Sequence, residues 1–183
     1  MKLQIIGDDI LDTIVLGGGC FWCVEGALLG LKGVTKVIPG YSGGHTENPT
    51  YEEVCSKKSG HAEVVEVTFN EEIIPRRILL EVFFTCHDPT QLNRQGNDIG
   101  PQYRSVIFYK NDEELTDIEE VIGYLQQNFV DDIVTEVSPL INFFVAENVH
   151  HNYFANNPNN PYCSMVVGPK ISKTRAKHAS LYK

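Results

Sequence analysis

The chain has 183 residues, of which 42% are hydrophobic and 21% charged, a balance typical of a globular protein that folds as one domain. Its 15 basic and 24 acidic residues give a net charge of −9, which argues against a general nucleic-acid-binding protein because phosphates would be repelled. No apolar run approaches the roughly 20 residues that span a bilayer, so we expect no membrane segment.

The start of the chain carries Asp8, Asp9 and Asp12 where a secretory signal peptide would keep an uncharged apolar core. We therefore expect a cytoplasmic protein with one domain over residues 1–183, residues 1–12 being an N-terminal extension, and we also expect a monomer. In a reducing cytosol the cysteines should be thiols, so that any disulfide would be transient and catalytic. They are Cys20, Cys23, Cys55, Cys86 and Cys163.

Hydrophobic periodicity and turn residues predict a regular series of elements up to residue 109. The series is a strand over 13–17, a helix from about 20 to 30, a strand over 34–41, a short helix from about 51, a strand over 61–69, a helix after Pro75 and a strand over 103–109. Residues 87–102 between the last two look irregular. Apart from the short helix, the order β-α-β-β-α-β is the ferredoxin-like pattern.

The remaining residues elaborate this core. A further amphipathic helix has the apolar positions Ile118, Val121, Ile122, Leu125 and Phe129. Two strand-like runs over 133–137 and 141–147 would extend the sheet or form a hairpin, and residues 150–163 indicate a short helix and then a loop packed over the domain. We therefore expect an α+β fold.

The C-terminal segment, residues 164–183, is basic. From Lys170 onward it contains no acid, and we expect its cations to form the solvated face of a C-terminal helix rather than a docking surface. The cations are Lys170, Lys173, Arg175, Lys177 and Lys183.

Three glycines and Cys20 join the first strand to the first helix, at residues 17–20. At a helix N-terminus, unpaired N–H groups and the positive end of the dipole favour a thiolate, so we expect a lowered pKa for Cys20 and a nucleophilic sulfur. The glycines, which lack side chains, would let a substrate approach this sulfur closely.

Cys23 lies one helical turn after Cys20, the arrangement by which a second thiol attacks an oxidised first one and closes a small disulfide. Phe21 and Trp22 flank the nucleophile, where their rings would form an apolar slot for a small group. Ordinary burial in the core is the alternative interpretation for both rings.

Strand alternation places Glu63 on the more apolar face of the strand over 61–69. A carboxyl group there must either pair with a partner or, desolvated, hold its proton to higher pH. A raised pKa would suit a proton donor near neutrality. The alternative is a glutamate at the strand end that points to solvent, and the pattern leaves both interpretations open.

Loop-rich segments supply three more polar candidates, and such segments often build binding sites. Hydroxyl and carboxyl groups there could hydrogen-bond a polar substrate oxygen, although a lone loop tyrosine is more often a surface or core residue. The candidates are Tyr51, Asp98 and Tyr103.

Two other functions compete for the cysteine pair. A structural zinc site could combine Cys20 and Cys23 with His150 and His151, but a second Cys-x-x-Cys or a His-x-x-x-His is missing from the sequence. A thioredoxin-like disulfide exchanger also places such a pair between a strand and a helix. The α+β order differs from the usual thioredoxin arrangement, however, and two aromatic residues between the cysteines would crowd a protein disulfide.

Several separate stretches, in order from about Thr13 to the C-terminal region, resemble the A-type peptide methionine sulfoxide reductases, in a variant with a GCFWC motif. They are "GGGCFWCVE", "GYSGGHTENPTYEEVC", "SGHAEVVEVTF", "FFTCHDPTQLNRQGNDIGPQYRS" and "NPYCSMVVGPKISKTR". The resemblance implies that Cys20 is the nucleophile, that Phe21 and Trp22 hold the substrate methyl group, and that Glu63 donates a proton to the sulfoxide oxygen. It assigns further binding roles at this oxygen to Tyr51, Tyr103 and Asp98.

The same resemblance implies reduction of methionine S-sulfoxide, free or in oxidised proteins, for protein repair under oxidative stress. Cys20 would become a sulfenic acid as methionine is released, a resolving thiol would form a disulfide, and thioredoxin would restore the dithiol. The resemblance implies neither a metal nor a bound organic cofactor. The family fold, a two-layer α/β sandwich related to the ferredoxin-like pattern, agrees with the predicted elements.

The chain departs from many family members in its tail. Those members carry resolving cysteines in a glycine-rich C-terminal tail, whereas here no cysteine follows Cys163. Cys23 is therefore the expected resolving residue, by its closeness to Cys20 and by resemblance to members with GCFWC. Cys163 is the alternative, because a tail loop could fold over the site.

Overall fold

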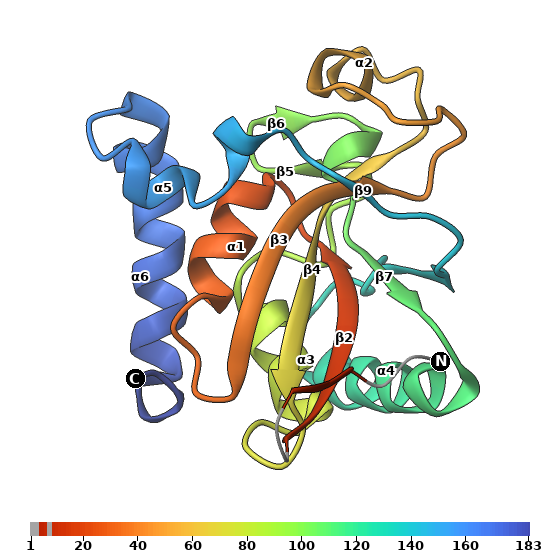
Figure 1. Cartoon of the computed structure of the whole chain (residues 1–183), viewed down its shortest axis with the longest axis vertical. Helices are drawn as coiled ribbons and strands as arrows, with labels where there is room; N and C mark the ends of the chain where they lie inside the picture. Colours follow the sequence, from red (N-terminus) through yellow and green to blue (C-terminus); the bar gives the residue numbers. More distant parts are fainter. Residues whose placement is uncertain (1–3, 7–8) are drawn as a thin grey trace.

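The computed structural model describes residues 4–6 and 9–183 and is built on a seven-stranded sheet (Figure 1). The strands are β1 (Gln4–Ile6), β2 (Asp9–Gly17), β3 (Val34–Ser42), β4 (Ala62–Asn70), β7 (Val106–Tyr109), β8 (Glu136–Pro139) and β9 (Phe144–Val145). They lie in the order β8-β7-β2-β4-β3-β9, and β1 pairs with β2. A small hairpin of β5 (Arg94–Gln95) and β6 (Asp98–Ile99) stands apart from this sheet.

The helices are α1 (Phe21–Leu28), α2 (Tyr51–Cys55), α3 (Arg76–Thr85), α4 (Asp112–Leu125), α5 (Tyr153–Asn156) and α6 (Gly168–Lys177). A π-helical turn over Cys163–Val167 leads into α6. Short 3-10 turns cover Pro101–Tyr103, Gln126–Asn128, Asn148–His150 and Ala179–Leu181. Within the described residues, no helix is both long and apolar enough to cross a membrane.

The predicted ferredoxin-like pattern is confirmed. The chain runs β2-α1-β3-β4-α3-β7, and these four strands lie in the order β7-β2-β4-β3, each antiparallel to its neighbour. The main hydrophobic core lies between one face of the sheet and the helices. A smaller cluster includes Val64 and Phe108, and Leu140 and Phe143 pack against it. The predicted strands after α4 extend the sheet, since β8 pairs with β7 and β9 with β3.

Several boundaries differ from the prediction. The first core strand begins at Asp9, so that the end of the expected N-terminal extension belongs to the sheet, whereas residues 1–3 and 7–8 lie outside the described residues. The last core strand begins only at Val106, because Tyr103, where it was expected to begin, belongs to a 3-10 turn that Pro101 opens.

Two further details are corrected. The range 87–102, expected to be irregular, contains the β5-β6 hairpin. The helix predicted to reach Phe129 ends at Leu125, and a 3-10 turn over Gln126–Asn128 separates it from Phe129.

Helix α1 lies between the sheet and α6 (Figure 1). The two helices meet at Gly26, where a Cβ atom would lie only 2.3 Å from Cδ1 of Ile171. A side chain at this point would displace the end of the Ile171 side chain, so the glycine favours close packing of α6 on the helix that begins after Cys20.

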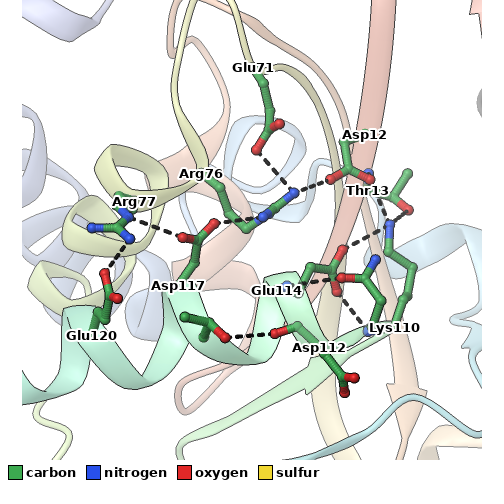
Figure 2. Close-up of polar contacts among 12 residues, drawn as sticks. Asp12, Thr13, Glu71, Arg76, Arg77, Lys110, Asp112, Glu114, Asp117 and Glu120 are labelled. Atoms are coloured by element: carbon green, nitrogen blue, oxygen red, sulfur yellow. Dashed lines mark hydrogen bonds and ion pairs between the residues drawn. The ribbon is translucent and has the colours of Figure 1, made fainter.

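An ion network fastens β2, α3 and α4 together at the end of the sheet (Figure 2). Arg76, 5% exposed, donates to Asp12 at 2.8 Å and to Asp117 at 2.7 Å, and its guanidinium lies 3.0 Å from Glu71. Lys110 adds a contact of 2.7 Å to Asp12. Burial opposes the ionisation of Asp12, yet Lys110 and Arg76 together hold its pKa below the usual range.

Replacing Arg76 by methionine should therefore leave partly buried carboxylates without their cation. We expect Arg76→Met to lower the free energy of unfolding by about 3 kcal/mol, as is usual when one partner of a buried ion pair is removed. Arg77→Met is the matched control, because Arg77 is half exposed in its pairs with Asp117 and Glu120, and exposed pairs add little to stability. Urea unfolding at neutral pH measures both, and equal losses would contradict this account of the network.

Candidate active site

Helix α1 begins directly after the three glycines, with Cys20 as its N-cap residue. The space beside the glycines is occupied: a Cβ atom on Gly18 would lie 2.8 Å from the His87 ring, and one on Gly19 would lie 2.8 Å from Cγ of Gln95. Gly19 also has a φ of +84°, which L side chains rarely adopt. The glycines thus make room for protein neighbours, while their expected role as an approach path for a substrate stays a prediction.

Cys20 and Cys23 lie one turn apart on α1, and both are buried free thiols joined by a side-chain hydrogen bond. Burial raises the pKa of Cys20, and the hydrogen bond with Cys23 and the charge of Glu63 raise it further. The N–H of Trp22 at the helix start lowers this pKa, but burial outweighs it. The predicted net lowering of the Cys20 pKa is therefore wrong.

Of the two thiols, Cys23 is the one that ionises more readily. The hydrogen bond from Cys20 lowers the pKa of Cys23, burial opposes this effect, and the positive charge of Lys170 adds to the lowering. Asp98 acts in the opposite direction. The thiol best able to lose its proton is thus the one that the sequence predicts as resolving.

Glu63 lies on β4 with only 1% of its surface exposed, and its Oε2 accepts a hydrogen bond of 3.1 Å from the backbone N–H of Phe21. Burial raises the pKa of Glu63 to about 8, against the lowering effect of the Phe21 N–H. The negative charges of Asp98 and Cys23 act in the same direction as burial. Of the two interpretations left open by the sequence, the desolvated carboxyl is correct and the solvent-facing glutamate is wrong.

The two aromatic residues between the cysteines have different surroundings. Phe21 is buried in the core, with the rings of Tyr41 at 5.8 Å and Tyr51 at 6.4 Å between centroids. Trp22 is half-buried and stacks on Tyr153 at 3.7 Å, with 6° between the ring planes. Phe21 is therefore also a core residue, whereas Trp22 presents part of an aromatic surface.

Tyr51 and Tyr103 reach the same site from two different loops. Tyr51 starts α2 behind a capping box, in which Thr50 N–H donates to Glu53 at 2.8 Å and Thr50 Oγ1 accepts from Glu53 N–H at 3.2 Å. Burial raises the pKa of both tyrosines, and the charge of Glu63 is the next cause for each. Both hydroxyls are thus neutral donors within electrostatic reach of the buried carboxyl.

Asp98 joins the site through a tyrosine that sequence reasoning missed. The hydroxyl of Tyr162 donates to Oδ2 of Asp98, and the Tyr162 ring meets Trp22 edge to face at 5.9 Å. Tyr162 lies in the segment predicted as a loop over the domain. In the sequence, only the position of an aromatic residue beside Cys163 pointed to Tyr162, and nothing indicated that it pairs with Asp98.

Glu147 is a second functional candidate that sequence reasoning missed. It accepts hydrogen bonds from the Tyr41 hydroxyl at 3.0 Å and the Tyr51 backbone N–H at 3.1 Å, and it lies 3.2 Å from Nε2 of His150. His150 in turn accepts from Nε1 of Trp22 at 3.2 Å. An acid at the end of a predicted strand, three residues before a histidine, was the only sequence signal for this chain of contacts.

The residues that the zinc alternative requires have other partners, since His150 bonds to Trp22 and Glu147. In the part of the chain that the structure describes, no three His, Cys, Asp or Glu side chains cluster in a way that could hold a metal ion.

Cys163, the alternative resolving residue, is also a buried free thiol, at the start of the π-helical turn. Burial raises its pKa, and the charge of Cys23 raises it further, so the two sulfurs lie within electrostatic reach. The structure therefore gathers all the residues predicted for the site around the start of α1.

Known proteins are similar to this chain over nearly its whole length. The family model "Peptide methionine sulfoxide reductase" matches residues 12–182. "Peptide methionine sulfoxide reductase MsrA" of Saccharolobus solfataricus is 50% identical over 163 residues, which is 89% of this chain and 92% of the relative. The protein of the same name from Natronomonas pharaonis is 53% identical over 169 residues, 91% of this chain and 95% of the relative.

Solved structures agree with these relatives. Reduced Mxr1 from Saccharomyces cerevisiae matches with a TM-score of 0.81 and 31% identity over 87% of this chain and 92% of its own. Mxr1 in complex with Trx2 matches with a TM-score of 0.58 and 23% identity, over 83% of this chain and 90% of its own, and this likeness is one of fold. By sequence over nearly its whole length, the chain belongs to the peptide methionine sulfoxide reductase family.

Proposed function

We propose that this protein reduces methionine S-sulfoxide, free or in oxidised proteins, to methionine and so repairs proteins under oxidative stress. The observation that carries the proposal is the buried Glu63 carboxyl, which holds its proton to a pH of about 8 beside the helix start that presents Cys20. Membership of the peptide methionine sulfoxide reductase family supports the same reaction.

The first step joins the sulfoxide sulfur to Cys20. Glu63 protonates the sulfoxide oxygen as the Cys20 sulfur attacks, because an oxygen that carries a proton is a far better leaving group. Tyr51 and Tyr103 donate hydrogen bonds to the same oxygen. The oxygen passes to Cys20 as a sulfenic acid, methionine leaves, and the Cys20 proton returns to Glu63, so the step is balanced.

Substrate recognition uses the aromatic surface beside the thiols. We place the methyl group of the sulfoxide against Phe21 and Trp22, and Asp98, fixed by Tyr162, beside the polar end of the site. An apolar wall opposite hydrogen-bond donors distinguishes the methyl group from the oxygen on the pyramidal sulfur. The two sulfur epimers exchange these groups, which gives a physical basis for selecting one of them.

The second step closes a disulfide. Cys23 is the proposed resolving residue, because it lies one turn from Cys20, shares a hydrogen bond with it and has the lowered pKa of the pair. Cys163 is the alternative, because it is a buried free thiol whose pKa the charge of Cys23 raises, and it could take over the disulfide.

A thioredoxin-type protein is the proposed reductant of this disulfide, and the structure of the relative Mxr1 in complex with Trx2 supports it. The two thiols carry the electrons and a carboxyl group carries the proton, so the chemistry uses side chains alone. We further propose a monomer that works in the cytoplasm, where thiols stay reduced.

Cys20→Ser removes the proposed nucleophile while keeping the size of the side chain. We expect methionine release in a single turnover to fall by at least about 100-fold, since a hydroxyl is a much weaker nucleophile than a thiol. Cys86→Ser is the control for the cost of a buried hydroxyl elsewhere. Stoichiometric methionine from Cys20→Ser at the wild-type rate would refute the role of Cys20.

Glu63→Gln keeps the shape of the proposed donor and removes its proton. We expect a loss of about 100-fold or more in the methionine-release step, with substrate binding retained. In the wild type, this step should fall as pH rises through about 8, because the protonated form of Glu63 is lost there, and this alkaline decline should vanish in the variant. Glu25→Gln is the control, because Glu25 is a buried carboxyl on α1 whose pKa is raised by burial and which bonds to Asn152 N–H. Equal pH profiles for wild type and Glu63→Gln would exclude the role.

Cys23→Ser tests the resolving step. Methionine release in one turnover should persist, while turnover with thioredoxin should fall at least about 10-fold because the sulfenic acid is no longer resolved by its neighbour. Mass spectrometry after one turnover of the wild type should find a disulfide between Cys20 and Cys23. A link between Cys20 and Cys163 would move the role to the tail.

A further inference from the structure

Glu147 joins three segments of the chain at the site, although 41% of its side chain is exposed. Its Oε1 accepts the backbone N–H of Tyr51 at 3.1 Å, while its Oε2 accepts the Tyr41 hydroxyl at 3.0 Å and lies 3.2 Å from Nε2 of His150. The preceding residue, Ala146, donates its N–H to a carbonyl of β3 at 2.9 Å, which holds the chain in place just before the carboxyl group. Glu147 therefore connects β3, the start of α2 and the 3-10 turn after β9.

All three partners of this carboxylate are hydrogen-bond donors. The indole N–H of Trp22 can only donate, so Nδ1 of His150, which accepts it at 3.2 Å, carries no hydrogen. Burial lowers the pKa of His150 despite the nearby Glu147, so the uncharged ring has its hydrogen on Nε2, which faces Glu147. A carboxylate has acceptors alone on both of its oxygens, whereas an amide of the same shape would turn an N–H₂ group toward one of these donors.

The contact with Tyr51 completes the start of α2. The capping box satisfies two other N–H groups of this turn, and the Tyr51 N–H, which has no partner within the helix, donates to Glu147. Tyr41, which donates to the other oxygen, lies opposite Glu63 in the pairing of β3 with β4. The carboxylate thus links the backbone of Tyr51 to the strand pair that carries the proposed proton donor.

The contact with His150 extends the same network to the aromatic surface. The His150 ring lies 4.5 Å from the Tyr51 ring and 5.9 Å from the Trp22 ring between centroids, and it also accepts the Trp22 indole N–H. Tyr51 is the proposed donor to the sulfoxide oxygen, and Trp22 is proposed to hold the methyl group. Glu147 therefore reaches both substrate-binding residues, Tyr51 through its backbone and Trp22 through the imidazole.

We propose that Glu147 is a positioning residue, whose carboxylate holds Tyr51 and Trp22 in fixed places relative to each other. This inference rests on the proposed function, and Glu147 acts through these two residues without taking part in proton transfer. Loss of the carboxylate should displace the Tyr51 hydroxyl from the sulfoxide oxygen and so slow methionine release. It should also loosen the Trp22 ring and so weaken binding of the methyl group.

The test compares Glu147→Gln with the matched control Glu53→Gln. Both changes remove one negative charge from a side chain that bonds to the start of α2, but Glu53→Gln can keep its bond, because either residue type closes a capping box. Single-turnover methionine release over a range of methionine S-sulfoxide concentrations gives the maximal rate and the substrate affinity. Trp22 is the only tryptophan of the chain, so proton–nitrogen NMR shows one indole N–H resonance, which reports on its bond to His150.

We expect Glu147→Gln to lower the maximal rate about tenfold and the affinity about threefold, whereas Glu53→Gln should stay within about twofold of the wild type. The indole resonance should shift in Glu147→Gln alone, and the same spectra show that the variant is folded. In a Tyr51→Phe background, which already lacks the hydroxyl, Glu147→Gln should lower the rate by less than about twofold, because changes that act through one contact are not additive.

Wild-type rate and affinity in Glu147→Gln would overturn the proposal, as would an unchanged indole resonance. A tenfold loss that persists in the Tyr51→Phe background would overturn it too, because the carboxylate would then act by a route other than Tyr51. An equal loss in Glu53→Gln would contradict it, since the lost charge rather than the contacts would be responsible. Failure of the proposed function is distinguishable from all of these, because the wild type itself would then release no methionine.

Discussion

The burial of the Glu63 carboxyl against the first turn of α1 is the constraint on which the rest of the site depends. The N–H of Phe21 is one of the donors that a helix start leaves without a partner, and Cys20 caps the helix without a side-chain hydrogen bond. The carboxyl on β4 supplies the acceptor at 3.1 Å. One contact therefore completes the helix, fixes the carboxyl beside the thiols and keeps it out of water, where it would lose its proton several pH units earlier.

Burial at the start of α1 also gives the two thiols different pKa values, so that Cys20 holds its proton more firmly than Cys23 does. Cys20, buried and beside the charge of Glu63, has a raised pKa and keeps its proton, whereas the hydrogen bond from Cys20 lowers the pKa of Cys23. Helix α6 of the basic C-terminal segment packs against α1, the helix that carries Cys23.

The sequence was sufficient where the signal is local. Strand alternation placed Glu63 on an apolar face, and the glycine-rich junction located Cys20 at a helix start, which the structure confirms. It was insufficient where distant segments meet: the pairing of Tyr162 with Asp98 spans 64 residues and that of Glu147 with Tyr51 spans 96. The expected thiolate at Cys20 was wrong for a related reason, because the helix dipole is a local effect and the burial that outweighs it is set by tertiary packing.

The measurement that tests the central claim most directly is the titration of the Glu63 carboxyl itself. Carboxyl carbon NMR of protein labelled at glutamate, with Glu63→Gln to assign the resonance, reports the protonation of this one group. The account predicts a midpoint near pH 8. A midpoint near the ordinary glutamate value of 4.5 would contradict it, because an ionised carboxylate at neutral pH could not donate the proton that the sulfoxide oxygen requires.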